Sequence, residues 1–234
     1  MRHMLNSRSE EQDDSHWLSV SDLMAGLMVV FLFIAIALMR NAMIEKNQIK
    51  EVAVAYQENQ VAIYEALINT FSKDLERWDA QIDKDSLTFV FNSPEILFKT
   101  GEIKLNTQYM DLLKNFFPRY LMTLGPFKES ISEVRIEGHT SSIWNKYHND
   151  TEAYFLNMEL SQGRTRSVLE YVYSLNTVEN ERTWIKKHIA AVGFSSAKLI
   201  KKANGKEDRK RSQRVSFRVI TNADIRIKQI LGSD

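Results

Sequence analysis

The sequence predicts a single N-terminal transmembrane helix that continues into a long helix or coiled coil, followed by a two-layer α/β domain. A charge-free apolar run extends from Leu23 to Met39, and the 67 residues after Gly26 contain neither Gly nor Pro. From about Ser86, segments typical of strands and helices alternate, which indicates an α/β domain. We expect a tail at 1–16, the membrane helix at 17–39, a helical linker or coiled coil at 40–84 and the α/β domain at 85–234.

Composition excludes several classes of function. The 234 residues carry 31 Lys and Arg against 30 Asp and Glu, so a formal charge of +1 gives no support for direct nucleic-acid binding. The absence of cysteine excludes a disulfide scaffold, a thiolate metal site and a cysteine nucleophile. The five histidines lack metal-ligand spacing, and the basic residues within 201–211 are typical of a solvated loop. We therefore expect no metal site, no cofactor and no enzymatic activity.

The apolar run is long enough to cross a membrane. Counted from Trp17, the segment has about 23 residues, and a helix rising roughly 1.5 Å per residue then spans a hydrocarbon core of about 30 Å. A cleaved signal peptide would begin with basic residues, whereas acidic residues at 10, 11, 13 and 14 precede this run, which favours an uncleaved anchor. Lys and Arg occur on both sides of the segment, so the charge rule does not decide its orientation.

Asp22 stands near the start of the membrane segment. A carboxylate at bilayer depth costs on the order of 3 kcal/mol, so such residues usually face protein or water and carry function. In the alternative interpretation, Ser21 or Asp22 caps the helix at the interface and the span begins at Leu23. The remaining 17 residues are at the short limit for a span, which favours a position of Asp22 inside it.

Beyond the membrane, apolar residues recur in steps of three, four or seven, with Asn59 among them. Such a stripe is typical of a parallel homodimeric coiled coil, and an amphipathic helix packed on its own domain is the alternative. A helix from Ser21 to about Ile82 would be roughly 90 Å long. The stripe comprises Ile49, Val52, Tyr56, Ile63, Leu67, Phe71, Leu75, Trp78 and Ile82.

The C-terminal domain has a β-α-β-α-β-β pattern. Residues 87–91, 134–138, 190–194 and 213–221 are rich in β-branched, aromatic or alternating apolar positions and predict strands. Residues 105–123 and 157–175 have helical periodicity. About 145 residues are enough for an independent core.

Two sets of residues resemble known families. Residues 17–24, WLSVSDLM, lead into the apolar span and resemble the start of stator B subunits of ion-driven rotary motors, the flagellar MotB type. The second set resembles the motifs of the OmpA-like peptidoglycan-binding domain. It comprises Ile136-Glu137-Gly138-His139-Thr140, Asn157-x-x-Leu160-Ser161-x-x-Arg164-Thr165-x-x-Val168, Gly193-Phe194 and Gln213-Arg214-Val215.

The resemblance implies a bacterial inner-membrane protein with a cytoplasmic N-terminus, a periplasmic C-terminal domain and no catalytic site. It implies a homodimer surrounded by about five copies of a MotA-like multi-span subunit. Asp22, next to Ser21, would take up and release the translocated cation, H⁺ or Na⁺. The acidic tail, the Gly-His-Thr-Ser-Ser sequence and the insertion before Asn157 most resemble the B components of the Zorya phage-defence motors.

The peptidoglycan site implied by the resemblance departs from the family pattern. The position of the aspartate that accepts the diaminopimelate ammonium is Ser141, followed by Ser142. Arg164, which matches the arginine that binds the diaminopimelate carboxylate, is retained; a surface salt bridge is its alternative role. Asp150 or Glu152 is a candidate for the missing charge. The full set of expected peptidoglycan-binding residues is Thr140, Ser141, Ser142, Asn157, Leu160, Arg164 and Arg214.

Three alternatives remain beside an ion-driven defence motor. The chain could be a membrane tether that binds the cell wall without ion flux, or a flagellar-type stator subunit. It could also be an energy-transducing subunit of the biopolymer-transport type, which should lack the Asn-x-x-Leu-Ser-x-x-Arg set that begins at Asn157.

Overall fold

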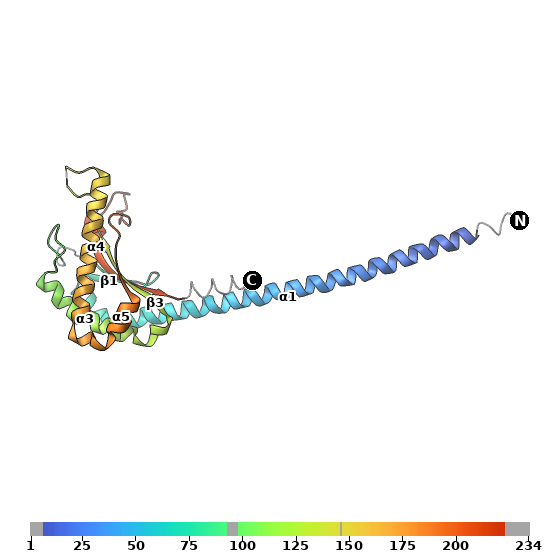
Figure 1. The fold of residues 1–234 in the computed structure, drawn as a ribbon, viewed down its shortest axis with the longest axis horizontal. Coiled ribbons are helices and arrows are strands. Elements are labelled where there is room, and N and C mark those ends of the chain that lie inside the picture. Colours follow the sequence, from blue (N-terminus) through green and yellow to red (C-terminus); the bar gives the residue numbers. More distant parts are fainter. Residues whose placement is uncertain (1–6, 93–97, 146, 223–234) are drawn as a thin grey trace. The chain divides into compact units, whose positions relative to one another are not determined.

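The computed structural model describes residues 7–92, 98–145 and 147–222 (Figure 1). They belong to two compact units, one formed by the chain up to Ala53 and one by the chain from Val54 onward. The helices are α1 (Ser7–Leu75), α3 (Thr107–Leu124), α4 (Asp150–Ser174), α5 (Arg182–His188) and α6 (Arg209–Ser212), with 3-10 helices η1 (Gly125–Ser130) and η2 (Asn176–Glu181). The strands are β1 (Ala80–Asp83), β2 (Thr88–Phe91), β3 (Ile131–His139), β4 (Ile189–Gly193) and β5 (Arg214–Thr221).

The second unit is built on a mixed five-stranded sheet in the order β1-β2-β5-β3-β4. Among these five strands, β3 and β4 are the parallel pair, because α4 and α5 connect them and return the chain to the same end of the sheet. The predicted α/β class is therefore confirmed. The strands expected at 87–91, 134–138, 190–194 and 213–221 correspond to β2, β3, β4 and β5. The helix expected at 105–123 corresponds to α3.

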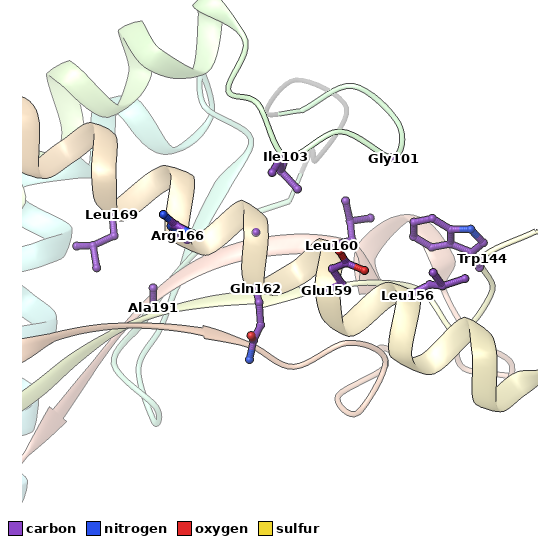
Figure 2. Close-up of a pocket in the computed structure, with 11 residues that line it drawn as sticks. Gly101, Ile103, Trp144, Leu156, Glu159, Leu160, Gln162, Arg166, Leu169 and Ala191 are labelled. Atoms are coloured by element: carbon purple, nitrogen blue, oxygen red, sulfur yellow. The ribbon is translucent and has the colours of Figure 1, made fainter.

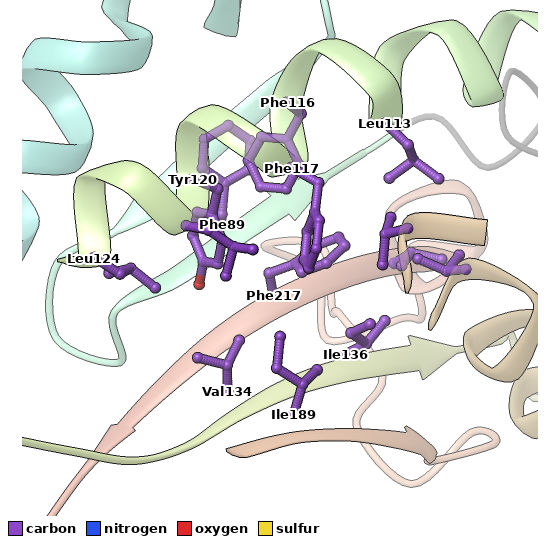
Figure 3. Packing of buried hydrophobic residues seen from close by; sticks show 14 of the residues in the cluster. Phe89, Leu113, Phe116, Phe117, Tyr120, Leu124, Val134, Ile136, Ile189 and Phe217 are labelled. Carbon is purple, nitrogen blue, oxygen red and sulfur yellow. The ribbon is translucent and has the colours of Figure 1, made fainter. Parts of the chain in front are cut away.

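One face of the sheet carries the hydrophobic core (Figure 3). Phe217 of β5 lies opposite Ile136 of β3 and Phe89 of β2, so their side chains share this face. Phe116 of α3 lies on them, with ring centroids 5.0 Å from Phe217 and 4.7 Å from Phe89. The aromatic residues of α3 thus join the helical layer to the sheet.

The last turns of α1 belong to this core. Ile63, Leu67 and Phe71 are fully buried, and the Phe71 ring lies 5.3 Å from both Phe89 and Phe116. Here the coiled-coil prediction is wrong, because the apolar stripe packs against its own domain. Asn59, expected as a polar position in a coiled coil, donates a hydrogen bond from Nδ2 to Ser130 Oγ at 2.9 Å.

The expected helix to Ile82 is also too long. Helix α1 ends at Leu75, and Asp79 adopts a φ of +46°, which no helix continues through. The chain then reverses so that Ile82 pairs with Phe89 in β1 and β2. Strand β1 was missed because its four residues alternate between half-buried and exposed, which is a weak pattern.

Helix α4 begins earlier than the sequence pattern predicts. Residues before Asn157 were expected to form an insertion, yet the helix starts at Asp150. Asn149 caps it: its side chain accepts a hydrogen bond from Glu152 N, and the Glu152 carboxylate accepts one from Asn149 N. This capping box satisfies two N–H groups at the helix start and explains the earlier boundary.

Candidate functional site

The apolar part of α1 carries the first candidate site. Within the described chain, one helix is long and apolar enough to cross a membrane, with a mean hydropathy of 2.5 over its most apolar window. The helix already begins at Ser7, so Ser21 and Asp22 lie well inside it. The alternative in which either residue caps the helix start is therefore wrong. Leu23 and Met28 are more than two-thirds exposed in the single chain, so the helix presents an apolar surface of the kind that marks interaction with a membrane or a partner.

The second candidate site lies where β3 and β4 end beneath α4, and two glycines permit the close approach. A Cβ on Gly138 would lie 2.7 Å from the carbonyl oxygen of Ser161, and one on Gly193 would lie 2.5 Å from Gln162 N. Any larger residue would push α4 away from the strand ends. The Gly-His-Thr and Gly-Phe motifs thus bring the two turns against one helix.

The turn after β3 is held by its neighbours on both sides. Thr140 N donates to the carbonyl of Ser195 at 2.9 Å, and Ser195 Oγ donates to the carbonyl of Tyr154 at 2.6 Å. Asn157 Nδ2 donates to the carbonyl of Ser141 at 3.2 Å. Of the expected peptidoglycan-binding residues, Thr140, Ser141 and Asn157 therefore come together in one buried network, in which Asn157 positions the backbone of the turn.

A carboxylate that no sequence motif indicated lies beside this turn. Glu207 accepts a hydrogen bond from Ser142 N at 3.0 Å and another from Ser142 Oγ at 2.6 Å. Its side chain is 16% exposed, so it remains accessible from outside. Asp150 and Glu152 instead occupy the first turn of α4, where Glu152 is engaged in the capping box. No local motif pointed to Glu207, because it lies 65 residues from Ser142 in sequence.

Arg164 is buried in α4 and holds the loop before α3. Its Nε donates to the carbonyl of Glu102 at 3.0 Å, one terminal nitrogen donates to the carbonyl of Lys99 at 3.3 Å, and the guanidinium lies 4.9 Å from the centroid of Phe98. Burial lowers the pKa of Arg164 to about 10, so it stays charged at neutral pH. The surface-salt-bridge alternative is wrong, because no acidic partner contacts Arg164 among the described residues.

Two expected residues lie apart from this network. Leu160 faces a groove along α4, described below. Arg214, at the start of β5, donates to the carbonyls of Lys198 and Ser212 at 3.2 and 3.0 Å, and burial lowers its pKa. It lies opposite His139 in the sheet register.

Two residues of β3, Glu137 and His139, form a buried acid–imidazole pair next to Arg214 of β5. Glu137 Oε2 lies 3.4 Å from His139 Nε2 and 4.0 Å from Lys198 Nζ, and the His139 ring stacks on Phe194. Burial lowers the pKa of His139, although Glu137 opposes that effect. Burial would raise the pKa of Glu137, but the hydrogen bond from His139 and the charge of Lys198 outweigh it and leave that pKa lowered. The pair therefore favours an ionised Glu137 beside a neutral His139.

A family model and several solved structures are similar to parts of this chain. The model of the OmpA family matches residues 97–213. A MotB-like protein from Desulfovibrio vulgaris is 18% identical, with 74% of this chain and 94% of that one covered and a TM-score of 0.48. The cell wall anchor of the type VI secretion system from Pseudomonas aeruginosa is 19% identical, with coverages of 66% and 96% and a TM-score of 0.45.

Among the described residues, an apolar helix long enough to cross a membrane precedes a domain of the OmpA family, and the two together define the class of protein. The Zorya protein ZorB of Escherichia coli is 53% identical over 222 residues, which cover 95% of this chain and 94% of that protein. The chain belongs to the ZorB family.

Proposed function

We propose that this chain is the B subunit of an ion-driven membrane motor, anchored to peptidoglycan and acting in anti-phage defence. The observation that carries the proposal is the identity of 53% to the Zorya protein ZorB across nearly the whole chain. The arrangement of Asp22 in an apolar helix and an OmpA-family domain in the same chain supports it. The helix provides a site for charge movement, and the domain provides attachment.

In the proposed topology the tail at 1–16 is cytoplasmic and the α/β domain lies in the periplasm, where the cell wall is. The apolar residues Ile49, Val52 and Tyr56 precede the buried core residues of α1, which begin at Ile63, and they remain the candidate for a homodimeric coiled coil. The exposed apolar side chains around Asp22 would be covered by a MotA-like multi-span subunit and by lipid.

Asp22 would be the ion-carrying group, and the cation would be H⁺ or Na⁺. A carboxylate inside a helix bundle is costly when ionised, and binding of a cation neutralises it. Alternation between the two states changes how the helix fits against surrounding subunits. The membrane potential supplies about 2.3 kcal/mol per elementary charge per 100 mV, which is enough to drive such a cycle.

Peptidoglycan would bind beside the turn after β3, near α4. The contacts of Arg164 use two of its five N–H donors, which leaves three for a carboxylate of a stem peptide. Glu207 would supply the negative charge that Ser141 and Ser142 lack, because a carboxylate that accepts two hydrogen bonds has lone pairs left for an ammonium group.

Asp22→Asn tests the motor directly, since it keeps the side-chain shape and removes the titratable group. We expect cells that express it with its partner subunit to lose phage protection and ion flux, while the protein still reaches the membrane and binds isolated cell walls. Glu45→Gln, on the same helix beyond the apolar run, is the matched control and should keep full protection.

The tether alternative predicts a different pair of results. If Asp22→Asn protects cells fully while Arg164→Ala does not, the chain acts as an anchor and the motor proposal is wrong. If both variants protect fully, neither ion transfer nor the proposed wall contact is required.

A further inference from the structure

A groove of about 850 Å³ runs along the outer side of α4 (Figure 2). Its volume lies within the range of about 300–1,000 Å³ typical of small-molecule sites. At one end, Trp144 lies near Leu156 and Leu160, with the carboxylate of Glu159 beside them. Gln162 and Arg166 line the groove further along the helix.

The side chains of three polar residues in this groove are unpartnered in the part of the chain that the structure describes. Among the described residues, no hydrogen bond or ion pair engages the side chains of Glu159, Gln162 or Arg166. Together they present an acceptor, an amide that both donates and accepts, and a guanidinium fork. An indole ring and aliphatic side chains lie next to these planar polar groups, so the groove offers apolar and hydrogen-bonding surface together.

This combination suits a ligand that is uncharged but rich in hydroxyl and amide groups. The charges of Glu159 and Arg166 cancel, so the groove does not favour a polyanion or a polycation. A pyranose ring has an apolar C–H face that can lie flat on the Trp144 indole, while its equatorial hydroxyls reach planar polar side chains at the rim. Acetamido groups would add one donor and one acceptor per sugar.

The groove is continuous with the proposed wall-binding site. Leu160 lines it from the helix turn between Asn157 and Arg164, and Gly163 allows the loop residue Ile103 to form its far wall. Ile103 is 49% exposed, which leaves this wall open to solvent. A polymer that reaches Arg164 through a side branch would therefore lay its main chain close to Trp144.

We propose that this groove binds the amino-sugar backbone of the cell-wall glycan, as a second contact beside the stem-peptide site. The inference rests on the proposed wall attachment. It assigns Trp144 as the stacking residue and Glu159, Gln162 and Arg166 as hydrogen-bonding residues for sugars. Attachment then depends on the glycan strand as well as on the peptide.

The test uses the full chain purified in detergent and three probes: intact sacculi, a peptide-free glycan in the form of an uncharged N-acetylglucosamine oligomer, and a free stem tripeptide that contains diaminopimelate. We expect the wild-type chain to bind all three. Trp144→Ala should weaken the affinity for peptide-free glycan roughly tenfold and leave that for the tripeptide unchanged. Arg164→Ala should weaken tripeptide binding. Trp144→Phe, which keeps a ring, should restore most of the glycan affinity.

Phe155→Ala is the matched control, because Phe155 is an exposed aromatic residue on the same helix that does not line the groove. Thermal unfolding of each variant checks that the domain is intact. An equal loss of glycan binding in Phe155→Ala and Trp144→Ala would overturn the groove assignment. A change of oligomeric mass in Trp144→Ala with unchanged glycan binding would show that a second copy occupies the groove.

The probes also separate this inference from the proposed function. A wild-type chain that binds sacculi and the tripeptide but not peptide-free glycan would refute the groove site and leave wall attachment standing. A wild-type chain that binds none of the three would refute wall attachment itself.

Discussion

Glu207 reaches the turn after β3 from a loop near the end of the chain. Its two oxygens accept from the amide and the hydroxyl of Ser142, and this contact positions the carboxylate at the edge of the proposed peptidoglycan site. At the scale of single residues, Glu207 is therefore the candidate for the negative charge of the proposed site.

Glu207→Gln should weaken binding of the full chain to isolated sacculi by roughly tenfold, since about 1.4 kcal/mol of charge–charge attraction corresponds to that factor. The amide can still bond to Ser142, so the melting temperature should change little. Cosedimentation with sacculi measures the effect, and Glu170→Gln, an exposed change on α4, is the control. Unchanged binding would exclude Glu207 from the site.

His139 and Glu137 make the domain sensitive to acid. The pKa of His139 is lowered from its ordinary value of 6.5, so the unfolded chain takes up a proton at a pH where the folded chain does not. Stability from this group is present above about pH 6.5 and is lost as the pH falls toward the lower pKa of the folded state. The pKa of Glu137 is lowered too, so the folded domain also loses stability from this group as the pH falls below about 4.5.

We therefore expect the free energy of unfolding to fall between pH 7 and pH 5, by at most about 1.4 kcal/mol per pH unit for one proton. His139→Gln should flatten this slope, because it keeps a polar side chain and removes the titration. Denaturant unfolding in detergent at several pH values measures it. The more exposed His188, which stacks on Trp184, gives the control variant His188→Gln. A slope that His139→Gln leaves intact would contradict the assignment.

At the scale of elements, α1 has two parts with different partners. Up to Ala53 it belongs to one unit and from Val54 to the other, where its residues from Ile63 onward supply one wall of the domain core. Arg119 of α3 binds the last turns of α1 to the domain, since it donates to Asp74 Oδ2 at 2.8 Å and to the carbonyl of Thr70 at 2.7 Å. The end of the long helix is therefore an integral element of the α/β domain.

Phe71→Ala should lower the free energy of unfolding of the domain by about 3–5 kcal/mol, because it removes a fully buried ring between Phe89 and Phe116. The loss should not depend on protein concentration, whereas a residue in a dimer interface would give a concentration-dependent loss. Met122→Ala, on α3 and 72% exposed, is the control. A concentration-dependent effect of Phe71→Ala would favour the coiled coil here as well.

At the scale of the whole molecule, the proposal requires that the two ends of α1 lie on opposite sides of the membrane. The chain contains no cysteine, so any single introduced thiol reports on one position alone. Lys202 is exposed in the loop that precedes β5, and Ser9 precedes the apolar run.

We expect Lys202→Cys to react with a membrane-impermeant maleimide when the outer membrane of intact cells is made permeable. Ser9→Cys should react only after the inner membrane is also broken, because the tail would be cytoplasmic. Labelling followed by gel shift measures both. Reaction of Ser9→Cys in cells with an intact inner membrane would reverse the proposed orientation.

Local sequence patterns were enough to predict most elements of the fold. Leu23–Met39 is apolar without interruption, and the alternation in residues 213–221 is that of a half-buried strand. Both properties depend on neighbours along the chain. The motif residues Thr140, Ser141 and Asn157 were also found from the sequence, and the structure adds that they share one hydrogen-bonded network.

The tertiary structure decided what local patterns leave open. Periodicity shows that one face of a helix is apolar but not what covers it. The pattern at Ile63 and Phe71 is therefore compatible with a coiled-coil interface and with a domain core. Likewise, only folding brings Glu207 to Ser142 and places Trp144 in one groove with residues of α4, because these contacts join different segments of the chain. The charge of the site and the groove beside it are therefore properties of the fold.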